Sequence, residues 1–301
     1  ESTFTLTQNE VGKTISVEIS YEDTFGTLES IKSNATDTIA NANDDPVGGI
    51  FIDGIAEENQ SFISIGTSGV FFTPTSIFLS NTNDAVHSFC HCLPNKWHLM
   101  SVMLSASNCL DWVCSITESS IDQALKNAES FAKNINNIIN APYFLPYMSG
   151  ERTPHNDPYV RGSFHYLKTT TNQAALQYAV LEGISFGILD GFHSINSVNS
   201  KFEDIYLVGG GSKSLFWNQL LSTILNRKLS VCLESEFSAA LGASRLAMFV
   251  DQNIDDKDSI IKKIQVKENF YPAKSVINIL NKRYNNWKEI YKSNKEISKI
   301  Y

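Results

Sequence analysis

The sequence has no apolar run near the roughly 20 residues that a membrane-spanning helix needs. It also lacks an excess of positive charge, because 24 Lys and Arg residues stand against 32 Asp and Glu residues and leave a formal net charge of −8 at pH 7. An acidic surface does not attract nucleic acid or an anionic membrane, so we expect neither as a partner. The chain opens without an initiator Met or a basic-then-apolar leader, from which we expect a trimmed chain or an internal fragment.

Cysteine is scarce and odd in number, which is typical of reduced thiols in a cytoplasm rather than of a disulfide framework. The five are Cys90, Cys92, Cys109, Cys114 and Cys232. His87 and His91 lie beside the first two, but no second ligand pair has the spacing of a zinc site. We therefore predict a cytoplasmic protein with structural thiols and no metal-ligating residues.

Residues 1–60 contain no Cys, Trp, His or Met and are rich in Thr, Ser, Asn, Asp and Glu. Apolar and polar residues alternate over residues 15–21, and an apolar run over residues 50–52 precedes an Asp-Gly turn, so both segments are predicted strands. This first segment is therefore expected to be β-rich and of different origin from the rest. It resembles the immunoglobulin-like repeats of large bacterial surface proteins.

Residues 61–69 (SFISIGTSG) lead an apolar run into Gly66, Thr67, Ser68 and Gly69, and a second apolar run follows. This pattern predicts a β-hairpin with a tip of small residues. Gly66 and Gly69 let backbone N–H groups approach an anion, and the hydroxyls of Thr67 and Ser68 can donate hydrogen bonds to it. Such a tip suits a phosphate, while the same residues are also common in ordinary turns.

Residues 204–211 (DIYLVGGG) are predicted to form a buried parallel strand that ends in three glycines. Ser212, Lys213 and Ser214 follow, and then an amphipathic helix that carries Leu215. The glycines let a ligand lie against the backbone, and the start of the helix presents unpaired N–H groups to an anion. This arrangement is typical of a nucleotide site, and a tight strand-to-helix connection uses the same residues.

The remaining segments alternate between strands and helices. Residues 142–162 are expected to form a long loop, in which Glu151 and Arg152 form an ion pair that fixes the loop. In the helix after Asn172, small residues every four positions predict the close approach of another backbone. We predict further strands over 97–104 and 229–233, helices over 108–116, from 119–120 onward, over 238–250 and over 275–292, and a charged surface connector over 251–267.

Six segments occur in one order along the chain: SIGTSG, DAVHSFCHCLPNKWHLMSVMLSASNCLDWV, PYMSGERTPHNDPYVRGSF, AVLEGISFGILDG, IYLVGGGSKSLFWNQLLSTIL and AALGASRLA. They resemble the carboxy-terminal half of the bacterial xylulose kinases, a branch of the FGGY family of carbohydrate kinases. The resemblance covers residues 61–250 and the tail from Phe270 onward, about four-fifths of the chain.

The resemblance implies an α/β fold of the actin-like (ribonuclease H-like) ATPase type, with this chain as the second domain of a sugar kinase behind a short β-rich segment. ATP and the sugar would lie between two domains, with Mg²⁺ bridging the phosphates and a carboxylate accepting the proton of the attacking hydroxyl. The resemblance implies that the phosphates are contacted by Gly66, Thr67 and the turn of Ser105, Ala106 and Ser107. It implies that the adenosine site is lined by Gly209, Gly210, Gly211 and Ser214.

The sequence also departs from the family. Counting back from Gly66 places Asp45 where the family has its catalytic Asp in a Gly-Gly-Gly-Asp-Asn segment, but other residues replace the glycines and Pro46 follows. A linker between surface repeats would have the same composition. Tyr166 stands where the family normally has Gly. The amino-terminal domain, with its Asp-x-Gly-Thr phosphate motif and most of the sugar-binding groups, is absent from these 301 residues.

We therefore expect three parts: a β-rich segment over 1–60, the carboxy-terminal FGGY kinase domain over 61–250, and a charged connector with a terminal helix over 251–301. The parent reaction implied is ATP-dependent phosphorylation of D-xylulose to D-xylulose 5-phosphate, with little activity expected without an amino-terminal domain. Two alternatives stay open. One is a kinase of another sugar or polyol completed by a separate amino-terminal domain, and the other is a non-enzymatic adhesion module fused to a decayed kinase domain. The oligomeric state is open, with a homodimer as one arrangement.

Overall fold

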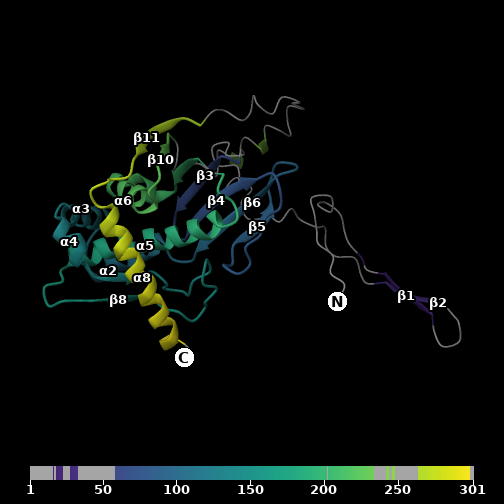
Figure 1. Ribbon diagram of the computed structural model, residues 1–301, viewed down its shortest axis with the longest axis horizontal. Coiled ribbons are helices and arrows are strands. Elements are labelled where there is room, and N and C mark those ends of the chain that lie inside the picture. The colour runs from purple at the N-terminus through teal and green to yellow at the C-terminus, as the bar shows by residue number, and fades with distance from the viewer. Residues whose placement is uncertain are drawn as a thin grey trace.

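The computed structural model describes residues 16, 18–22, 28–32, 58–201, 203–233, 242–243, 246–247 and 264–298. Its central element is a seven-stranded mixed sheet with the strand order β11-β10-β9-β3-β4-β6-β5 (Figure 1). The strands are β3 (Gln60–Ile65), β4 (Gly69–Thr75), β5 (His87–Cys90), β6 (Trp97–Met103), β9 (Asp204–Val208), β10 (Leu229–Cys232) and β11 (Val266–Phe270).

The pairing of the strands brings two predicted turns to one edge of the sheet. Ile65 pairs with Gly69, which confirms the predicted β3–β4 hairpin with its tip at residues 66–68. Strands β3 and β9 are parallel, and Ser64 lies opposite Val208. Because parallel strands end at the same edge, the hairpin tip lies beside the glycine-rich turn that follows β9.

Helix α5 (Gln173–Asn196) is the central helix and packs against β4 and β6 of the sheet (Figure 1). The Oδ1 atom of Asn172 accepts a hydrogen bond from the N–H of Ala175 at 3.0 Å, which confirms the predicted helix start. A Cβ atom at Gly183 would collide with the backbone carbonyl of Phe144, so the predicted close approach of another backbone is confirmed. The other helices are α2 (Ser107–Ile116), α3 (Ile121–Ala132), α4 (Ile135–Asn140), α6 (Leu215–Leu225) and α8 (Ile277–Ser298).

The terminal helix α8 belongs to the same hydrophobic core. It buries Leu280, Tyr284, Trp287 and Tyr291, which recur every three or four residues along one face. The Nε1 atom of Trp287 donates a hydrogen bond to the carbonyl of Phe144 at 2.8 Å. The predicted terminal helix is therefore confirmed, and this hydrogen bond fixes it to the segment that contains Phe144.

Two strands lie where the sequence predicted a connector or a loop. Strand β11 falls partly in the expected surface connector, yet it pairs antiparallel with β10 at the edge of the central sheet. Four of its five residues are exposed, so the sequence does not show the alternation of apolar and polar residues by which a strand is predicted. The start of the expected long loop is likewise a short strand, β7 (Tyr143–Leu145), which pairs with β8 (Ser163–His165) in a separate two-stranded sheet.

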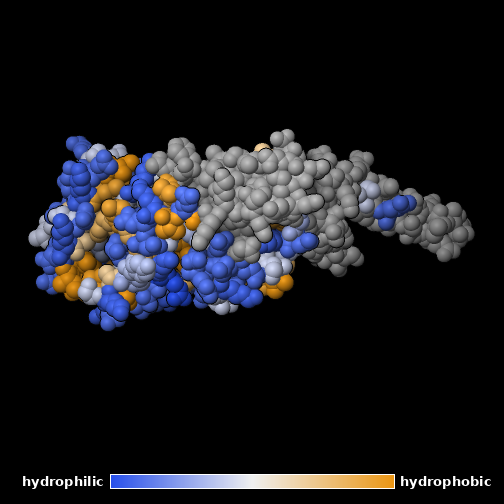
Figure 2. All heavy atoms as spheres, turned by 90° about the horizontal axis from the view of Figure 1, so that it is seen from above, coloured by the Kyte–Doolittle hydropathy of each residue, from blue (hydrophilic) through white to orange (hydrophobic). Residues whose placement is uncertain are grey.

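Strands β1 (Glu18–Glu22) and β2 (Leu28–Lys32) form an antiparallel pair of their own, and β1 overlaps the strand predicted over 15–21. The strand predicted over 50–52, Asp45 and most of the helix predicted over 238–250 lie outside the described residues. On the face shown in Figure 2, hydrophobic residues form several small patches among hydrophilic ones. Within the part of the chain that is described, no helix is long and apolar enough to cross a membrane.

Candidate functional site

The tip of the β3–β4 hairpin lies against the first turn of α2. The backbone N–H of Ala106 donates a hydrogen bond to the carbonyl of Thr67 at 2.9 Å, and the N–H of Ser107 donates to the carbonyl of Gly66 at 2.9 Å. Ala106 is the N-cap residue of α2 and makes no side-chain cap. The hairpin carbonyls therefore take the place of a capping side chain and fix the tip to the helix.

The glycine-rich turn after β9 approaches the same place from the neighbouring strand. Gly209 has φ +85°, and a Cβ atom there would lie 2.8 Å from the carbonyl oxygen of Ile65 at the end of β3. A Cβ atom at Gly211 would collide with the Ile65 side chain, whereas one at Gly210 would have no atom within 4 Å. Gly209 and Gly211 thus allow close packing, and Gly210 faces open space.

Helix α6 starts at Leu215, after Ser212, Lys213 and Ser214, as predicted. A short 3₁₀ helix, η3 (Gly210–Lys213), separates β9 from α6. Ser214 is the N-cap of α6, and its Oγ accepts the N–H of Trp217 at 3.2 Å. The strand predicted over 204–211 is shorter than expected, because β9 ends at Val208 and the 3₁₀ turn includes Gly210 and Gly211.

A cavity of about 460 Å³ opens where these elements meet. One part of its lining is small and polar, from the hairpin tip, the start of α2 and the glycine-rich turn. The other part is apolar, from α2, α3 and α6. The lining residues are Ile65, Gly66, Thr67, Ser107, Leu110, Asp111, Ile121, Asp122, Leu125, Gly210, Gly211, Lys213, Ser214 and Trp217.

Five of the ATP-binding residues implied by sequence line this cavity together: Gly66, Thr67, Gly210, Gly211 and Ser214. Ser107 also lines it, but Ser105 and Ala106 from the same turn are fully buried beside it. Gly209 shapes the turn through its contact with Ile65 and is not among the lining residues. The implied catalytic residue Asp45 lies outside the described part of the chain.

Three charged residues of the cavity were missed by sequence reasoning: Asp111, Asp122 and Lys213. Asp111 lies four residues after Ser107 in α2, a spacing that places both on one face of the helix. Lys213 lies two residues after the last of the three glycines. Helical spacing from Ser107 could have identified Asp111, but the position of Asp122 depends on how α3 packs.

The carboxylate of Glu151 binds the backbone at Leu104, just before the turn of residues 105–107, and does not form the predicted ion pair with Arg152. Its Oε1 atom accepts the N–H of Leu104 at 2.9 Å and the N–H of Arg152 at 2.7 Å, and the residue is 3% exposed. Arg152 is exposed, and in the described residues no ion pair joins the two side chains. Burial raises the pKa of Glu151 to about 8, and its Oε2 atom has no hydrogen-bond partner among the described residues.

A second buried carboxylate, Asp190 in α5, joins the same loop to α8. It accepts a short hydrogen bond from the hydroxyl of Tyr284 and lies 3.8 Å from Nε2 of His155. Burial raises the pKa of Asp190 to about 6 and lowers the pKa of His155 to about 4. His155 also stacks on Tyr291 with 3.6 Å between ring centroids, so its neutral ring serves packing.

The sequence was also compared with known proteins. The model of the FGGY family of carbohydrate kinases, C-terminal domain, matches residues 61–250. The chain is 38% identical over 234 residues to the xylulose kinase of Escherichia coli strain K12, a match that covers 78% of this chain and 48% of that protein. The xylulose kinase of Klebsiella pneumoniae is likewise 38% identical over 234 residues, covering 78% of this chain and 47% of that protein.

Among solved structures, a xyloylose kinase from Brucella ovis superposes with a TM-score of 0.77 at 31% identity and covers 84% of this chain and 51% of that one. These neighbours confirm the predicted actin-like α/β fold. The chain spans about half the length of the curated relatives it matches. By its family match and its fold, this chain is a member of the FGGY family of carbohydrate kinases, and residues 61–250 are its carboxy-terminal domain.

Proposed function

We propose that this chain supplies the carboxy-terminal half of a xylulose kinase, which transfers the γ-phosphoryl group of ATP to the 5-hydroxyl of D-xylulose. The observation that carries the proposal is the cavity shared by the β3–β4 tip, α2 and the η3–α6 turn. The two relatives described above are xylulose kinases, which supports this sugar over others. No disulfide joins the five cysteines, all of which lie in the described residues, and this supports a reducing cytoplasm as the place of work.

The chemistry of the cavity fits a nucleotide. Thr67 is exposed at the hairpin tip, and its hydroxyl makes no hydrogen bond within the described residues, so it can donate one to a phosphate oxygen. Gly210 leaves the surface open where the backbone would meet the adenosine. The exposed side chain of Ile121 and the partly exposed side chain of Leu125 provide an apolar surface for a purine ring.

Magnesium is proposed as a companion of the nucleotide. No group of three or more His, Cys, Asp or Glu residues in the described part of the chain could hold a metal ion. In the proposed complex, the ion would be carried on the phosphates of the bound nucleotide.

The proposal includes three parts of the chain, with boundaries after residues 60 and 250, and an amino-terminal domain that closes the cleft. Positioning supplies nearly all of the catalysis in phosphoryl transfer, so half a cleft is expected to turn over little or no substrate. Asp45 is proposed as the base only when such a domain is docked.

The proposal is tested by measuring ADP release that depends on both ATP and D-xylulose. The purified 301-residue chain alone should show little or none, and co-expression with the amino-terminal half of a xylulose kinase should produce it. D-ribulose and glycerol serve as alternative acceptors in parallel. Appreciable turnover by the chain alone, or turnover of another acceptor in preference to D-xylulose, would contradict the proposal.

A further inference from the structure

A second cavity of about 470 Å³ lies away from the nucleotide cavity and shares no lining residue with it. It is bounded by the end of α4, the β7–β8 segment and the middle of α8. Tyr143, Tyr166, Asn140, Lys168, Asn286 and Glu289 line it. Its size falls within the roughly 300–1,000 Å³ that is common for small-molecule sites.

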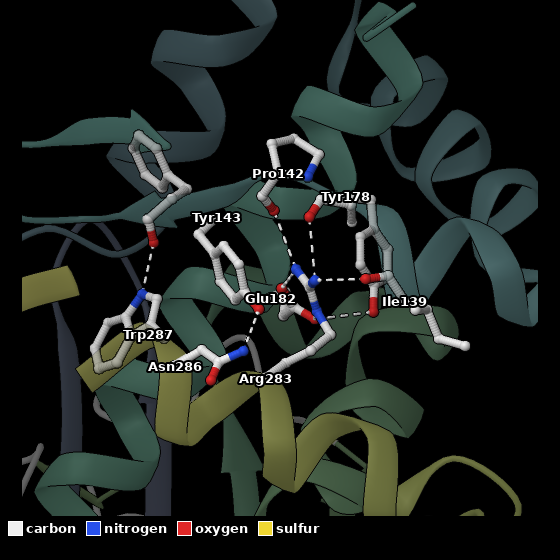
Figure 3. Close-up of polar contacts among 10 residues, drawn as sticks. Ile139, Pro142, Tyr143, Tyr178, Glu182, Arg283, Asn286 and Trp287 are labelled. Atoms are coloured by element: carbon white, nitrogen blue, oxygen red, sulfur yellow. Dashed lines mark hydrogen bonds and ion pairs between the residues drawn. The ribbon is translucent and has the colours of Figure 1, made fainter. Parts of the chain in front are cut away.

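The walls of this cavity are held in place by a buried ion pair (Figure 3). Arg283 of α8 donates to both carboxylate oxygens of Glu182, at 2.7 and 2.6 Å, and both side chains are nearly fully buried. The same guanidinium donates to the carbonyls of Ala141 and Pro142, each at 3.1 Å, between α4 and β7. The geometry of the cavity is therefore fixed before any ligand enters.

Tyr166 provides a second, independent observation. It is a non-glycine residue with φ +61°, a left-handed conformation that is unfavourable for a bulky side chain. The residue is 72% exposed, so burial does not offset this cost. The ring meets Tyr143 edge-on, with 5.8 Å between centroids, and forms an aromatic wall at the mouth of the cavity. Strained backbone conformations cluster at active sites and ligand clamps, and this motivates a binding role for Tyr166.

The polar groups of the lining define the ligand class. Lys168 and Glu289 carry opposite charges, so the lining has no net charge to favour an anion or a cation. The Nζ atom of Lys168 is held by Oδ1 of Asn140 at 3.0 Å, and Nδ2 of Asn286 is held by the hydroxyl of Tyr143 at 3.1 Å. These amide and amine groups can exchange hydrogen bonds with hydroxyls beside an aromatic face.

From these observations we infer that the cavity between α4, β7–β8 and α8 binds a neutral carbohydrate of one or two sugar rings, with the apolar face of one ring against Tyr166. This site is separate from the nucleotide cavity, and it does not depend on the function proposed above. A phosphorylated sugar is not favoured over a neutral one, because the lining is neutral overall.

The test is a titration of the full 301-residue chain with D-xylose, D-glucose and maltose, followed by ¹H–¹⁵N NMR. The side-chain amide signals of Asn140 and Asn286 should shift in a saturable manner with at least one of these sugars. Tyr166→Phe should keep the response, whereas Tyr166→Gly should weaken binding about tenfold or more. Glucose 6-phosphate should bind no more tightly than glucose.

The Tyr166→Gly variant separates binding from folding. Glycine accepts the left-handed conformation without strain, so this variant should unfold at an equal or higher urea concentration than the wild type. Tyr159→Ala, at a 67% exposed tyrosine that does not line the cavity, should bind the sugar as the wild type does. No saturable shift with any of the three sugars, or equal binding by Tyr166→Gly, would overturn the inference. Shifts that map to Gly66 or Gly210 would overturn it as well.

Discussion

The carbonyl oxygen of Thr67 accepts a hydrogen bond from the backbone N–H of Ala106 at 2.9 Å, and this contact joins the hairpin tip to helix α2. The contact uses only backbone atoms, so the side chain of Thr67 remains available to a ligand. The backbone carbonyl of Thr67 thus fixes the tip, while its side chain faces the cavity.

Removal of the Thr67 side-chain hydroxyl should weaken nucleotide binding without unfolding the protein. A hydrogen bond to a charged group contributes about 1.5–3 kcal/mol, so Thr67→Ala should raise the dissociation constant for ADP about tenfold or more. Thr67→Ser keeps the hydroxyl and should bind nearly as the wild type does. Calorimetric titration gives the constants, and equal affinity of the Ala variant would show that Thr67 does not contact the phosphates.

The glycine-rich turn allows a matched comparison of two neighbouring residues. Gly209→Ala should lower the free energy of unfolding by about 1–3 kcal/mol, because the residue has φ +85° and its Cβ would lie 2.8 Å from the carbonyl oxygen of Ile65. Gly210→Ala should cost little, since its Cβ would meet no atom within 4 Å. Urea denaturation measures both, and equal losses would contradict the described turn.

The buried carboxyl group of Glu151 should make stability depend on pH. The folded protein holds this proton up to a pKa of about 8, whereas the unfolded chain releases it near 4.5, so the folded state binds more protons between these values. Stability should therefore fall as pH rises through this window, by at most about 1.4 kcal/mol per pH unit. Glu151→Gln removes the titrating group and should flatten the curve.

The clearest range for this comparison is pH 6.5 to 8. Asp190 has a pKa raised to about 6, so it also lowers stability as pH rises, but it is largely ionised above pH 6.5 and contributes little to the slope there. His155, with a pKa lowered to about 4 from 6.5, costs stability only as pH falls below 6.5. Glu289→Gln, at an exposed position, serves as the control and should keep the wild-type slope. An unchanged slope in Glu151→Gln would refute a protonated Glu151.

The ion pair of Glu182 and Arg283 should show strong coupling in a double-mutant cycle. Glu182→Leu leaves the Arg283 guanidinium buried without its counter-charge and should cost about 3–5 kcal/mol. The double variant Glu182→Leu/Arg283→Met removes both charges and should be less destabilised than the sum of the single variants. Lys292→Gln breaks an exposed pair and should change stability by less than about 1 kcal/mol. Additive losses at the buried pair would contradict the account.

Features that depend on neighbouring residues could be predicted from sequence. The hairpin tip at residues 66–68, the N-cap Asn172 and the start of a helix near residues 119–120 follow from short-range patterns, and the structure has each of them. The small-residue stripe of α5 correctly predicted close approach at Gly183, although not that Phe144 would be the partner.

Features that depend on residues far apart in the chain could not be predicted from sequence. The cap of α2 comes from Thr67, 39 positions before Ala106 in the chain, and no local pattern shows it. Strand β11 is mostly exposed and is defined by its pairing with β10. The ion pair expected between Glu151 and Arg152 was wrong, because the carboxylate turns inward to the N–H of Leu104. Each of these arrangements is set by tertiary packing.

The most direct test of the central claim is to map ADP binding by ¹H–¹⁵N NMR on the full 301-residue chain. If the cavity between the β3–β4 tip, α2 and the η3–α6 turn is half of a nucleotide site, the backbone amide signals of Gly66, Thr67, Ser107, Gly210 and Gly211 should show the largest saturable shifts. Thr67→Ala should reduce them. Absence of shifts at millimolar ADP, or shifts that map to another part of the chain, would contradict the claim.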